Sequence, residues 1–411
     1  MTKKKKVIIV GSGISGLSAA CYLYKKFNVK IFEQNKYLGG HTHTHTIKIN
    51  QELVNVDSGF IVFNNFNYKN FIQFIQKLKI KYQISNMSFS VTNRQKKYEW
   101  SGKNFKSIFL SKNSLTLRYW RVLKDIFKFN KLTKQYINSE IVSKETVSQF
   151  LSSNKFSKEF LDFYFYPMCA SIWSNPVGKI KNFKIHFILS FFSNHGLINV
   201  IKKRPIWYTI SNGSKSYVEK IFKLVGEKNF IHEKVLKINQ QKKYIITSKG
   251  RKYKFDHAII ATHTDSAKKI LGKITLDQKK LLNMVKYRGN TAIMHTDTNV
   301  MPKNKNNWSS WNFLNRKKNF ALTYWMNLLQ NLTIDKNIFV SINCDDKIEK
   351  NKIIKKIKYS HPVFSNKTQD IKNKLNEVQG VNGVWFAGAW QGYGFHEDGL
   401  KSALRIVKKI R

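Results

Sequence analysis

A glycine-rich turn near the N-terminus constrains the fold of this 411-residue chain more than any other feature. The β-branched run Val7-Ile8-Ile9-Val10 predicts a short strand, and the turn Gly11-Ser-Gly-Ile-Ser-Gly16 follows it directly. Apolar residues then recur at helical spacing, and a second predicted strand, Val29 to Phe32, leads into Glu33. Because this acid lies 20 positions after Gly13 in a strand–turn–helix–strand order, the segment predicts a dinucleotide-binding βαβ unit.

The three glycines of this turn each suit a nucleotide-binding role. Gly11 makes the turn, Gly13 lets the backbone approach a pyrophosphate, and Gly16 allows close packing of the helix. The N-terminus of the helix then points its backbone N–H groups at the phosphates. Glu33 is expected to bind a ribose hydroxyl.

Patterning along the rest of the chain predicts an α/β protein that crosses several times between two domains. Long amphipathic stretches rich in aromatic residues, from about Gln73 to Pro205, predict a mainly helical insertion. Segments with strand-like and helix-like patterns alternate again after this insertion. The predicted division gives residues 1–72, 206–270 and 376–411 to the nucleotide-binding domain, and residues 73–205 and 271–375 to a substrate domain.

The formal net charge of +49 suggests a polyanionic partner at first sight. Only nine of the 73 basic residues are Arg, and the Lys residues are spread along the whole chain. A nucleic-acid footprint should cluster on one element and use Arg to contact bases, so we predict no nucleic-acid partner. The 42% of hydrophobic residues are enough for a sizeable core, which excludes a disordered basic protein.

The cysteines and the apolar runs bear on the cellular compartment. Cys21, Cys169 and Cys344 share no close spacing and cannot all pair, which favours a reduced, cytoplasmic setting. Lys3 to Lys6 before an apolar stretch resemble a signal peptide, but the regular glycine spacing argues against one. The longest mostly apolar run, Phe187 to Phe192, is far shorter than the ~20 residues of a membrane span. We therefore expect a cytoplasmic protein that is not an integral membrane protein.

Motifs spread over nearly the whole chain resemble the flavin-containing amine oxidase superfamily. The superfamily motifs are Gly11 to Gly16, Glu33, Leu38-Gly39-Gly40-His41-Thr42 and Val56-Asp57-Ser58-Gly59-Phe60. More specifically, the chain resembles a bacterial branch of predicted NAD/FAD-binding oxidoreductases associated with methyltransferases of the cyclopropane fatty acid synthase type. The motifs that carry this narrower resemblance are Gly40-His41-Thr42, Gly59-Phe60 with Asn64, Ala261-Thr262-His263, His295-Thr296-Asp297, Trp308-Ser-Ser-Trp311-Asn312, Tyr324-Trp-Met-Asn327, His361-Pro362-Val363 and Gly392-Tyr-Gly-Phe-His-Glu-Asp-Gly399.

The resemblance implies a Rossmann-like, doubly wound FAD-binding domain with a discontinuous α+β substrate domain, as in the amine oxidase and glutathione-reductase-2-like folds. It also implies FAD as the cofactor. The implied cofactor contacts are Gly11, Ser12, Gly13, Ser15, Gly16, Glu33 and the Val235 backbone for the ADP half, Gly39, Gly40, His41 and Thr42 near the pyrophosphate, Gly388, Gly394, Phe395 and Asp398 in the C-terminal segment over the isoalloxazine, and in addition Gly59 and Phe60. A helix beginning near Glu397 would point its positive end at this ring.

The substrate class is less constrained than the cofactor. Amine oxidases of the superfamily usually carry a lysine on the strand that Asn290 to His295 would correspond to, and this strand has none. The association of the bacterial branch with lipid methyltransferases implies instead oxidation or desaturation of a modified fatty acyl chain by hydride transfer to the flavin, with such a methyltransferase as a partner. Two alternatives remain: a flavin-dependent amine oxidase, and a non-catalytic flavin-binding partner of the methyltransferase.

Candidate catalytic residues lie in the C-terminal loop that the resemblance places at the flavin ring. Tyr393 could orient the substrate, His396 could handle a proton, and Glu397 is the third candidate. The alternative for the acids is that Glu397 and Asp398 only cap the helix that begins there.

Two further patterns have an ordinary explanation beside a functional one. His41, His43 and His45 alternate and could share a metal, but no other ligand spacing supports this, and we predict no metal site. The segment Leu115 to Tyr136 predicts a basic amphipathic helix, which could lie on an anionic membrane at the inner face or could be a helix with a solvated lysine face. The residues concerned are Leu115, Trp120, Leu123 and Phe127 with Lys124, Lys128, Lys131 and Lys134.

Overall fold

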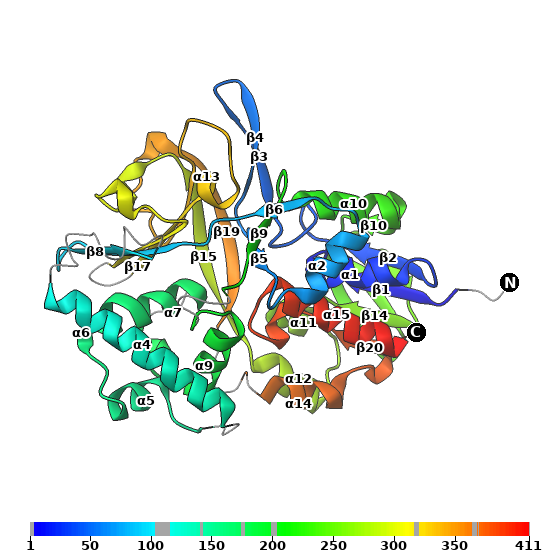
Figure 1. Cartoon of the computed structure of the whole chain (residues 1–411). Helices are drawn as coiled ribbons and strands as arrows, with labels where there is room; N and C mark the ends of the chain where they lie inside the picture. The colour runs from blue at the N-terminus through cyan, green and yellow to red at the C-terminus, as the bar shows by residue number, and fades with distance from the viewer. Residues whose placement is uncertain are drawn as a thin grey trace.

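Two β-sheets organise the chain, and each lies in a separate part of the molecule (Figure 1). The computed structural model describes residues 4–102, 116–139, 143–173, 177–198, 204–315, 320–363, 368 and 370–410. The N-terminal strands and the C-terminal helix lie together in one part, whereas the cyan helices of Figure 1 lie in the other.

The first sheet is parallel and contains the strand that precedes the glycine-rich turn. In spatial order its strands are β10 (Phe230–Ile231), β2 (Asn28–Phe32), β1 (Lys6–Val10), β14 (His257–Ile260) and β20 (Val384–Phe386). The chain continues from β1 to β2 on one side and only later adds β14 on the other side. The strand order therefore reverses at β1, and ligands of such sheets bind in the crevice at this switch point.

Both faces of this sheet are covered, because alternate residues of β1 enter different hydrophobic clusters. Val7 and Ile9 pack on one face and Ile8 and Val10 on the other. The first face carries α1 (Ile14–Leu23), α2 (Lys69–Lys77), α10 (Lys215–Val225) and α15 (His396–Ile410). The second face carries the antiparallel strands β11 (Val235–Asn239), β12 (Tyr244–Thr247) and β13 (Lys252–Lys254) with α11 (Thr264–Ile270), α12 (Leu276–Asn283) and α14 (Ile371–Val378).

The second sheet has seven strands drawn from two distant segments of the chain. In spatial order these are β19 (Ile353–Val363), β15 (Lys286–His295), β18 (Phe339–Ile342), β17 (Phe320–Trp325), β16 (Trp311–Asn315), β7 (Phe89–Asn93) and β8 (Tyr98–Ser101). Only β16 and β7 pair in parallel, and this pairing joins the two segments. Strands β7 and β8 lie inside the segment that the sequence predicted to be mainly helical.

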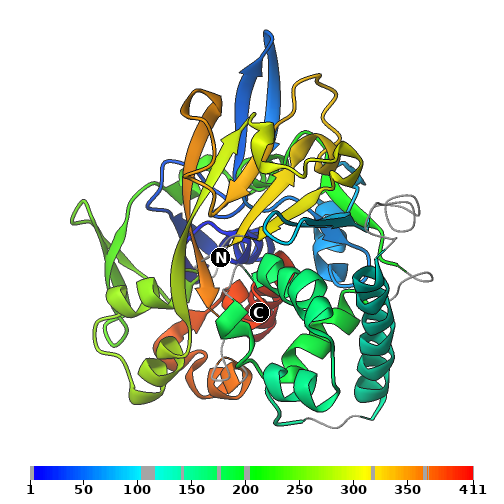
Figure 2. The same cartoon turned by 90° about the vertical axis from the view of Figure 1, so that its left-hand side faces the viewer.

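A helical layer with an aromatic core covers one face of the second sheet (Figure 2). Its helices are α4 (Leu117–Asn138), α5 (Val147–Ser153), α6 (Lys158–Phe160), α7 (Tyr166–Trp173), α8 (Val177–Ile180) and α9 (Ile185–Asn194), with a π-helical turn at Leu161–Phe165. Phe129, Phe160 and Phe192 are fully buried at the centre of this layer. The other face of the sheet packs on α13 (Met326–Leu329) and on the hairpin of β3 (Thr44–Ile49) and β4 (Glu52–Asp57).

A small sheet of β5 (Phe63–Asn64), β9 (Trp207–Ile210) and β6 (Tyr82–Ile84) completes the fold. The doubly wound α/β fold with a discontinuous second domain, predicted from the sequence, is confirmed. The boundaries of the five predicted segments stay a prediction; α2, which spans residue 72, packs against α15. Within the described residues, no helix combines the length and the apolar character that a membrane span requires.

Candidate active site

The glycine-rich turn has the geometry that its spacing predicted. Gly11 has a φ of +101°, and a Cβ atom there would lie 2.7 Å from the Ala261 carbonyl oxygen. At Gly16 a Cβ atom would lie 1.9 Å from the Gly11 carbonyl oxygen, so this glycine lets α1 approach the turn. A Cβ atom on Gly13, by contrast, would have no neighbouring atom of the protein within 4 Å. The turn therefore packs tightly on two sides and leaves an open side at the N-terminus of α1.

Glu33 is buried beside this turn and accepts hydrogen bonds from two residues. Its Oε2 accepts from the Ser12 backbone N–H at 2.9 Å and from Ser12 Oγ at 2.7 Å. Its Oε1 accepts from the Asn35 backbone N–H at 2.9 Å and from Asn35 Nδ2 at 3.0 Å. Ribose hydroxyls can replace the two side-chain donors, because those can rotate away while the backbone donors hold the carboxylate in place.

A second glycine pair lies against the first turn, as expected from the sequence. Gly39 donates its N–H to the Ser12 carbonyl at 3.0 Å, and a Cβ atom on Gly40 would lie 3.2 Å from the Gly13 Cα. The next residue, His41, has a buried Nε2 atom that has no hydrogen-bond partner in the described structure. Burial and neighbouring histidines hold the pKa of His41 well below its usual value, so the ring is neutral.

These features fit a dinucleotide with a pyrophosphate. The N-terminus of α1 carries no acidic residue in its first turn, so its N–H groups can bind an anion. The open side at Gly13 gives room for this anion, and the orphaned His41 nitrogen is a polar atom that lacks a partner. Val235 is the buried first residue of β11, in the core cluster that also contains Phe32 at the end of β2. The glycine-rich turn, Glu33 and the second glycine pair therefore lie together at the N-terminus of α1, and the predicted contact of Val235 with the adenine stays a prediction.

The C-terminal loop is shaped by Asp398, a buried acid in the first turn of α15. Its Oδ2 accepts from the backbone N–H groups of Tyr393 and Phe395 at 3.0 and 3.1 Å. A Cβ atom on Gly392 would lie 2.3 Å from its Oδ1, so only glycine fits there. Burial raises the pKa of Asp398 to about 6. The Asp398 carboxylate thus holds the loop in place. The predicted contact of Asp398 with the cofactor stays a prediction.

Two glycines give this segment its path. Gly394 has a φ of +92° and donates its N–H to the Ala389 carbonyl at 3.2 Å. Gly388 donates its N–H to Ser402 Oγ at 2.9 Å, and a Cβ atom there would lie 2.2 Å from the indole nitrogen of Trp390. Because glycine has no side chain, the predicted contacts of Gly388 and Gly394 with the cofactor would be made by their backbone atoms.

Glu397, predicted as a catalytic candidate, instead binds the start of another helix. Its Oε2 accepts from the Phe71 backbone N–H at 2.9 Å, and its Oε1 accepts from Asn70 Nδ2 at 2.6 Å and from the Asn70 backbone N–H at 3.2 Å. Lys401 lies 3.4 Å from Oε1. Both oxygens therefore stabilise the N-terminus of α2, which favours a positioning role over a chemical one.

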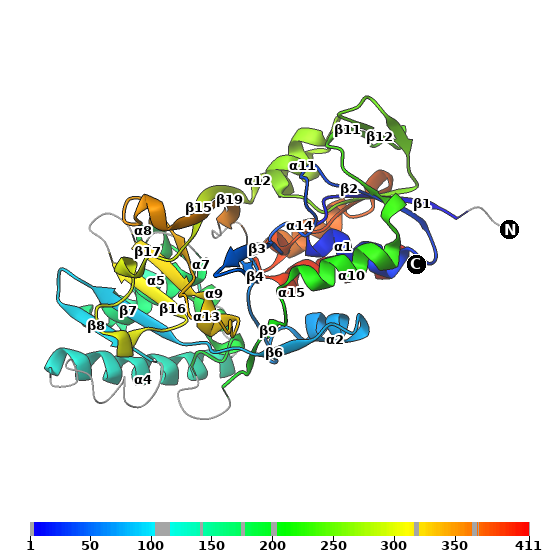
Figure 3. The same ribbon diagram turned by 90° about the horizontal axis from the view of Figure 1, so that it is seen from above.

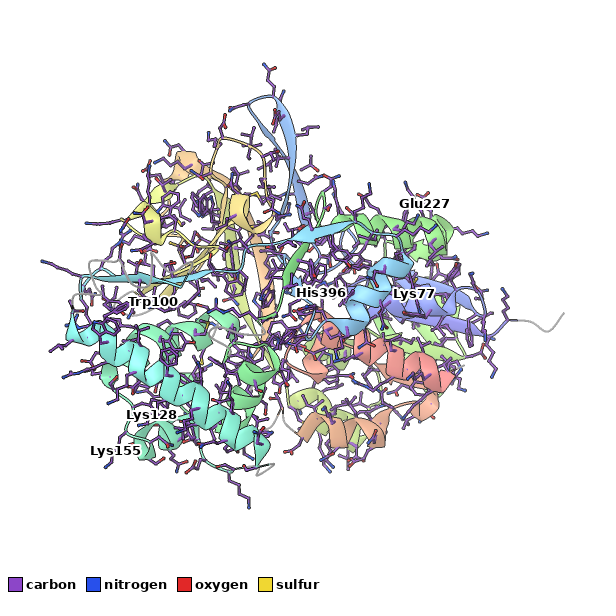
Figure 4. The ribbon with its side chains drawn as sticks, viewed as in Figure 1. Lys77, Trp100, Lys128, Lys155, Glu227 and His396 are labelled. Atoms are coloured by element: carbon purple, nitrogen blue, oxygen red, sulfur yellow. The ribbon has the colours of Figure 1, made fainter. Side chains whose placement is uncertain are left out.

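His396 lies at the junction of the two parts of the molecule (Figure 4), where it connects three segments. Its Nε2 is hydrogen-bonded with Thr42 Oγ1 at 2.9 Å and with Tyr217 Oη at 3.3 Å. Its ring stacks on Phe60 at a centroid distance of 3.5 Å. Burial lowers the pKa of His396 to about 3, so the ring is neutral near pH 7 and does not act as a cationic acid. These contacts favour a structural role for this residue as well.

Two other residues predicted to bind the cofactor, Gly59 and Ser15, make close contacts near this junction. A Cβ atom on Gly59 would lie 2.1 Å from the His41 carbonyl oxygen, to which the Phe60 N–H donates at 2.8 Å. Ser15 Oγ donates to the Gly399 carbonyl at 2.9 Å and so joins α1 to α15. The first contact joins two N-terminal loops, and the second joins α1 to the C-terminal helix.

One face of α9 meets the C-terminal loop, a contact that no motif in the sequence indicates. Phe187 and Phe191 lie 5.0 and 5.5 Å from the Tyr393 ring, between centroids. Phe191 and His195 lie 5.6 and 5.5 Å from the Phe395 ring. The three α9 residues follow one another every four positions, which places them on one side of a helix. That spacing was visible in the sequence, but its partner in the loop was not.

His195 is the titratable group of this face. Its Nδ1 lies 3.0 Å from the Phe191 carbonyl oxygen, which can only accept, so Nδ1 carries the hydrogen and the neutral ring keeps its lone pair on Nε2. Burial lowers the pKa of His195 to about 4. The ring is therefore neutral near pH 7.

The part of β15 from Asn290 to His295 contains no lysine, and its first residue lies beside a histidine of β19. Asn290 Nδ2 lies 2.8 Å from His361 Nδ1 on β19. The rings of His361 and His263 lie 5.2 and 6.1 Å from that of His41. Sequence spacing could not show this cluster, because its members come from three distant segments.

His43 and His45 belong to one network of side chains, in which Tyr359 Oη lies 2.6 Å from Ser58 Oγ. His45 Nε2 is hydrogen-bonded with Ser58 Oγ at 2.9 Å, and His43 Nδ1 lies 3.3 Å from Tyr359 Oη. No group of three or more potential ligands in the described part of the chain could hold a metal ion.

Comparisons with known proteins agree with this geometry. A family model described as flavin containing amine oxidoreductase matches residues 14–347. A 1-hydroxycarotenoid 3,4-desaturase of Flavobacterium sp. (strain P99-3) is 58% identical over 40 residues, which are 10% of this chain and only 8% of that protein's length.

Among solved structures, cyclohexylamine oxidase from Brevibacterium oxydans IH-35A superposes with a TM-score of 0.70 at 14% identity, covering 99% of both chains. A CLA-producing fatty acid isomerase from P. acnes superposes with a TM-score of 0.66 at 12% identity, covering 100% of this chain and 99% of the other. At these identities the structural matches establish a shared fold.

Proposed function

We propose a substrate class for this chain on the premise that it belongs to the flavin-containing amine oxidoreductase family and is an FAD-dependent oxidoreductase. The proposed substrate is a fatty acyl chain, native or modified, and the proposed reaction is its oxidation or desaturation. The observation that carries the proposal is the aromatic face of α9 against the C-terminal loop.

The surroundings of this loop suit an apolar chain better than a cationic amine. Tyr393 and Phe395 contact aromatic side chains of the helical layer. The two acids nearest in sequence, Glu397 and Asp398, have their carboxylates bound to backbone N–H groups. An amine would need a carboxylate or a similar group that remains available to it, whereas an acyl chain needs only apolar surface.

The fold of the family is compatible with such a substrate. One protein that shares the fold over nearly its whole length is named as a fatty acid isomerase. The short match, over 10% of this chain, is to a protein named as a 1-hydroxycarotenoid 3,4-desaturase. Cyclohexylamine oxidase shares the same fold. Amine oxidation is therefore the alternative that an experiment must exclude.

Desaturation of a CH2–CH2 unit removes a hydride and a proton. FAD, when bound, supplies the acceptor for the hydride and its two electrons. We assign His195 as the first acceptor of the proton, because its Nε2 keeps a lone pair in the tautomer that the Phe191 carbonyl selects; since burial lowers its pKa to about 4, it passes this proton on to solvent. Tyr393 stays protonated, since burial raises its pKa to about 12, and its ring would orient the chain between the loop and α9.

Anaerobic mixing of the flavin-loaded protein with phospholipid extract tests this function. Loss of flavin absorbance and acyl chains lighter by two hydrogens are the expected results. His195→Gln should retain flavin but slow its reduction by more than about tenfold. His232→Gln, at an exposed position, is the matched control. Peroxide release from amines with no reduction by lipid would replace the proposal with amine oxidation, and flavin that neither reduces would indicate a non-catalytic protein.

A further inference from the structure

The outer face of α4 combines exposed apolar side chains with lysines. Leu117, Trp120 and Phe127 are 79%, 52% and 54% exposed. Together with the exposed Lys124 and Lys131 they follow one another at spacings of three or four residues. Residues at such spacing lie on one side of a helix, so they form a single stripe along α4.

The helix is anchored from its other side, so this stripe is not a surface that the fold needs for its core. Tyr119, Val122 and Phe129 are buried in the core of the helical layer. Asp125, the one acid in α4, is also buried and accepts from the Ser157 backbone N–H at 2.8 Å. The structure also changes which residues belong to the predicted stripe.

The corrected stripe leaves out three residues of the predicted one, Leu115, Leu123 and Lys128, and adds Leu117; Lys128 is partly buried and donates to the Asn154 carbonyl at 2.5 Å. Leu123 packs against the core of the helical layer rather than facing outward. Leu115 lies outside the described residues, and the more exposed Leu117 provides the first apolar position. We define the α4 stripe as Leu117, Trp120, Lys124, Phe127, Lys131 and Lys134.

Charge is strongly one-sided along the stripe. Its three lysines are exposed, and Arg118 is exposed at the first turn. Arg121, next to the stripe, is paired with Glu159 at 3.3 Å. A surface of this kind, with Trp and Phe between cations, has the chemistry of a helix that lies at the interface of an anionic bilayer.

The position of α4 connects the stripe to the active site. Helix α4 packs on α9, and the opposite side of α9 carries the residues that contact the C-terminal loop. One helix therefore separates the stripe from Tyr393. Lys128 on α4 and Lys155 lie at the outer edge of the helical part (Figure 4).

We propose that the α4 stripe docks the protein on the surface of an anionic lipid bilayer. Leu117, Trp120 and Phe127 enter the interface between headgroups and acyl chains, and the lysines bind the anionic headgroups. The stripe runs along 18 of the 22 residues of α4, about 27 Å of helix, which suits a flat surface. The inference adds a partner to the proposed function and rests on the surface alone, so its test requires no turnover.

Vesicle sedimentation with the full-length, flavin-loaded protein tests the proposal. The vesicles contain phosphatidylcholine alone or phosphatidylcholine with phosphatidylglycerol, at low and at physiological salt. We expect binding to the anionic vesicles, and a loss of more than about tenfold in partitioning for Lys124→Glu/Lys131→Glu/Lys134→Glu. Leu117→Ala/Phe127→Ala should remove most of the binding that persists at physiological salt.

Matched controls are essential, because a chain with a net charge of +49 is attracted to any anionic surface. Lys242→Glu/Lys249→Glu/Lys254→Glu makes the same change of charge at exposed positions around β11–β13, at the opposite end of the molecule (Figure 3). Leu236→Ala/Leu276→Ala is the apolar control at two exposed positions. Both controls should bind vesicles as the unmodified protein does.

Tryptophan fluorescence adds a readout at one residue. The emission of Trp120, obtained as the difference between the protein and Trp120→Phe, should shift to shorter wavelength on anionic vesicles. Equal losses of vesicle binding in the stripe variants and their controls would overturn the proposal. So would an absence of vesicle binding, or a stripe that binds an acidic protein or a nucleic acid instead of vesicles. Flavin reduction by lipid in detergent would still support the proposed function in each of these cases.

Discussion

The glycine-rich turn and the C-terminal loop both border the predicted cofactor crevice, yet they are built differently. At the turn, backbone atoms approach one another so closely that Gly16 has a carbonyl oxygen 1.9 Å from where its Cβ would be. At the C-terminal loop, two acids of α15 hold separate segments: Asp398 holds its own loop and Glu397 holds α2. The tightest contact of the first region joins backbone atoms five residues apart, whereas the second region holds, through one side chain, a helix that is more than 300 residues away in the sequence.

The largest effect is expected at the tightest backbone contact. Gly16→Ala would place a methyl group 1.9 Å from the Gly11 carbonyl oxygen, and neither the turn nor α1 can move far within the core. We expect destabilisation of more than about 3 kcal/mol, measured by denaturant unfolding, or failure to obtain folded protein. A stable Gly16→Ala protein with a normal flavin content would show that the turn is looser than its contacts indicate.

Gly13→Ala should separate binding from folding at the same turn. The added methyl group has no protein atom within 4 Å, so the unfolding midpoint of the flavin-free protein should change little. It would, however, occupy the open side at the N-terminus of α1, and FAD affinity should fall by roughly ten- to a hundredfold, measured by fluorescence titration. Unchanged affinity would mean that the pyrophosphate does not approach Gly13.

The difference between the regions explains how much the sequence could predict. The βαβ unit, with Gly11, Gly13, Gly16 and Glu33, follows from local spacing, because each role depends on backbone that is close in sequence. The doubly wound fold could be predicted for the same reason. The strand pairing of β7 with β16 could not, since it joins segments about 220 residues apart through contacts with no local pattern.

The candidate catalytic residues show most clearly what the sequence could not predict. Tyr393, His396 and Glu397 are neighbours in the sequence, but their side chains contact α9, Tyr217 and α2 respectively. A motif gives the position of a residue along the chain and not the direction of its side chain. For this reason His195 was missed: its relation to the loop exists only after α9 packs beside it.

The titration of Asp398 gives a pH-dependent test of the second region. Burial raises its pKa from 3.8 to about 6, so between these values the folded protein binds a proton that the unfolded chain has released. Stability contributed by this group therefore falls as the pH rises from about 4 to 6 and is constant above that. Asp398→Asn has no such titration and can accept both loop N–H groups through its remaining oxygen.

The stability of the unmodified protein relative to Asp398→Asn should therefore decrease by about 2 kcal/mol as the pH rises from 4 to 6. Urea unfolding at several pH values measures this difference. Asp57, whose pKa burial also raises to about 6, titrates in both proteins and cancels in the comparison. A difference that stays constant with pH would mean that the Asp398 carboxyl is better solvated than its burial indicates.

A modest loss of stability is expected for Glu397→Gln, and this variant decides between the two roles of the residue. The amide keeps one acceptor oxygen for α2 but loses the negative charge at that helix N-terminus, which should cost about 1 kcal/mol in the free energy of unfolding. The rate of flavin reduction per bound flavin should remain within about twofold, because both carboxylate oxygens face α2. Single-turnover kinetics on protein of equal flavin content measures this rate. A rate loss of tenfold or more without destabilisation would return Glu397 to the reacting groups, and it would mean that side chains of the C-terminal loop change partners when the substrate binds.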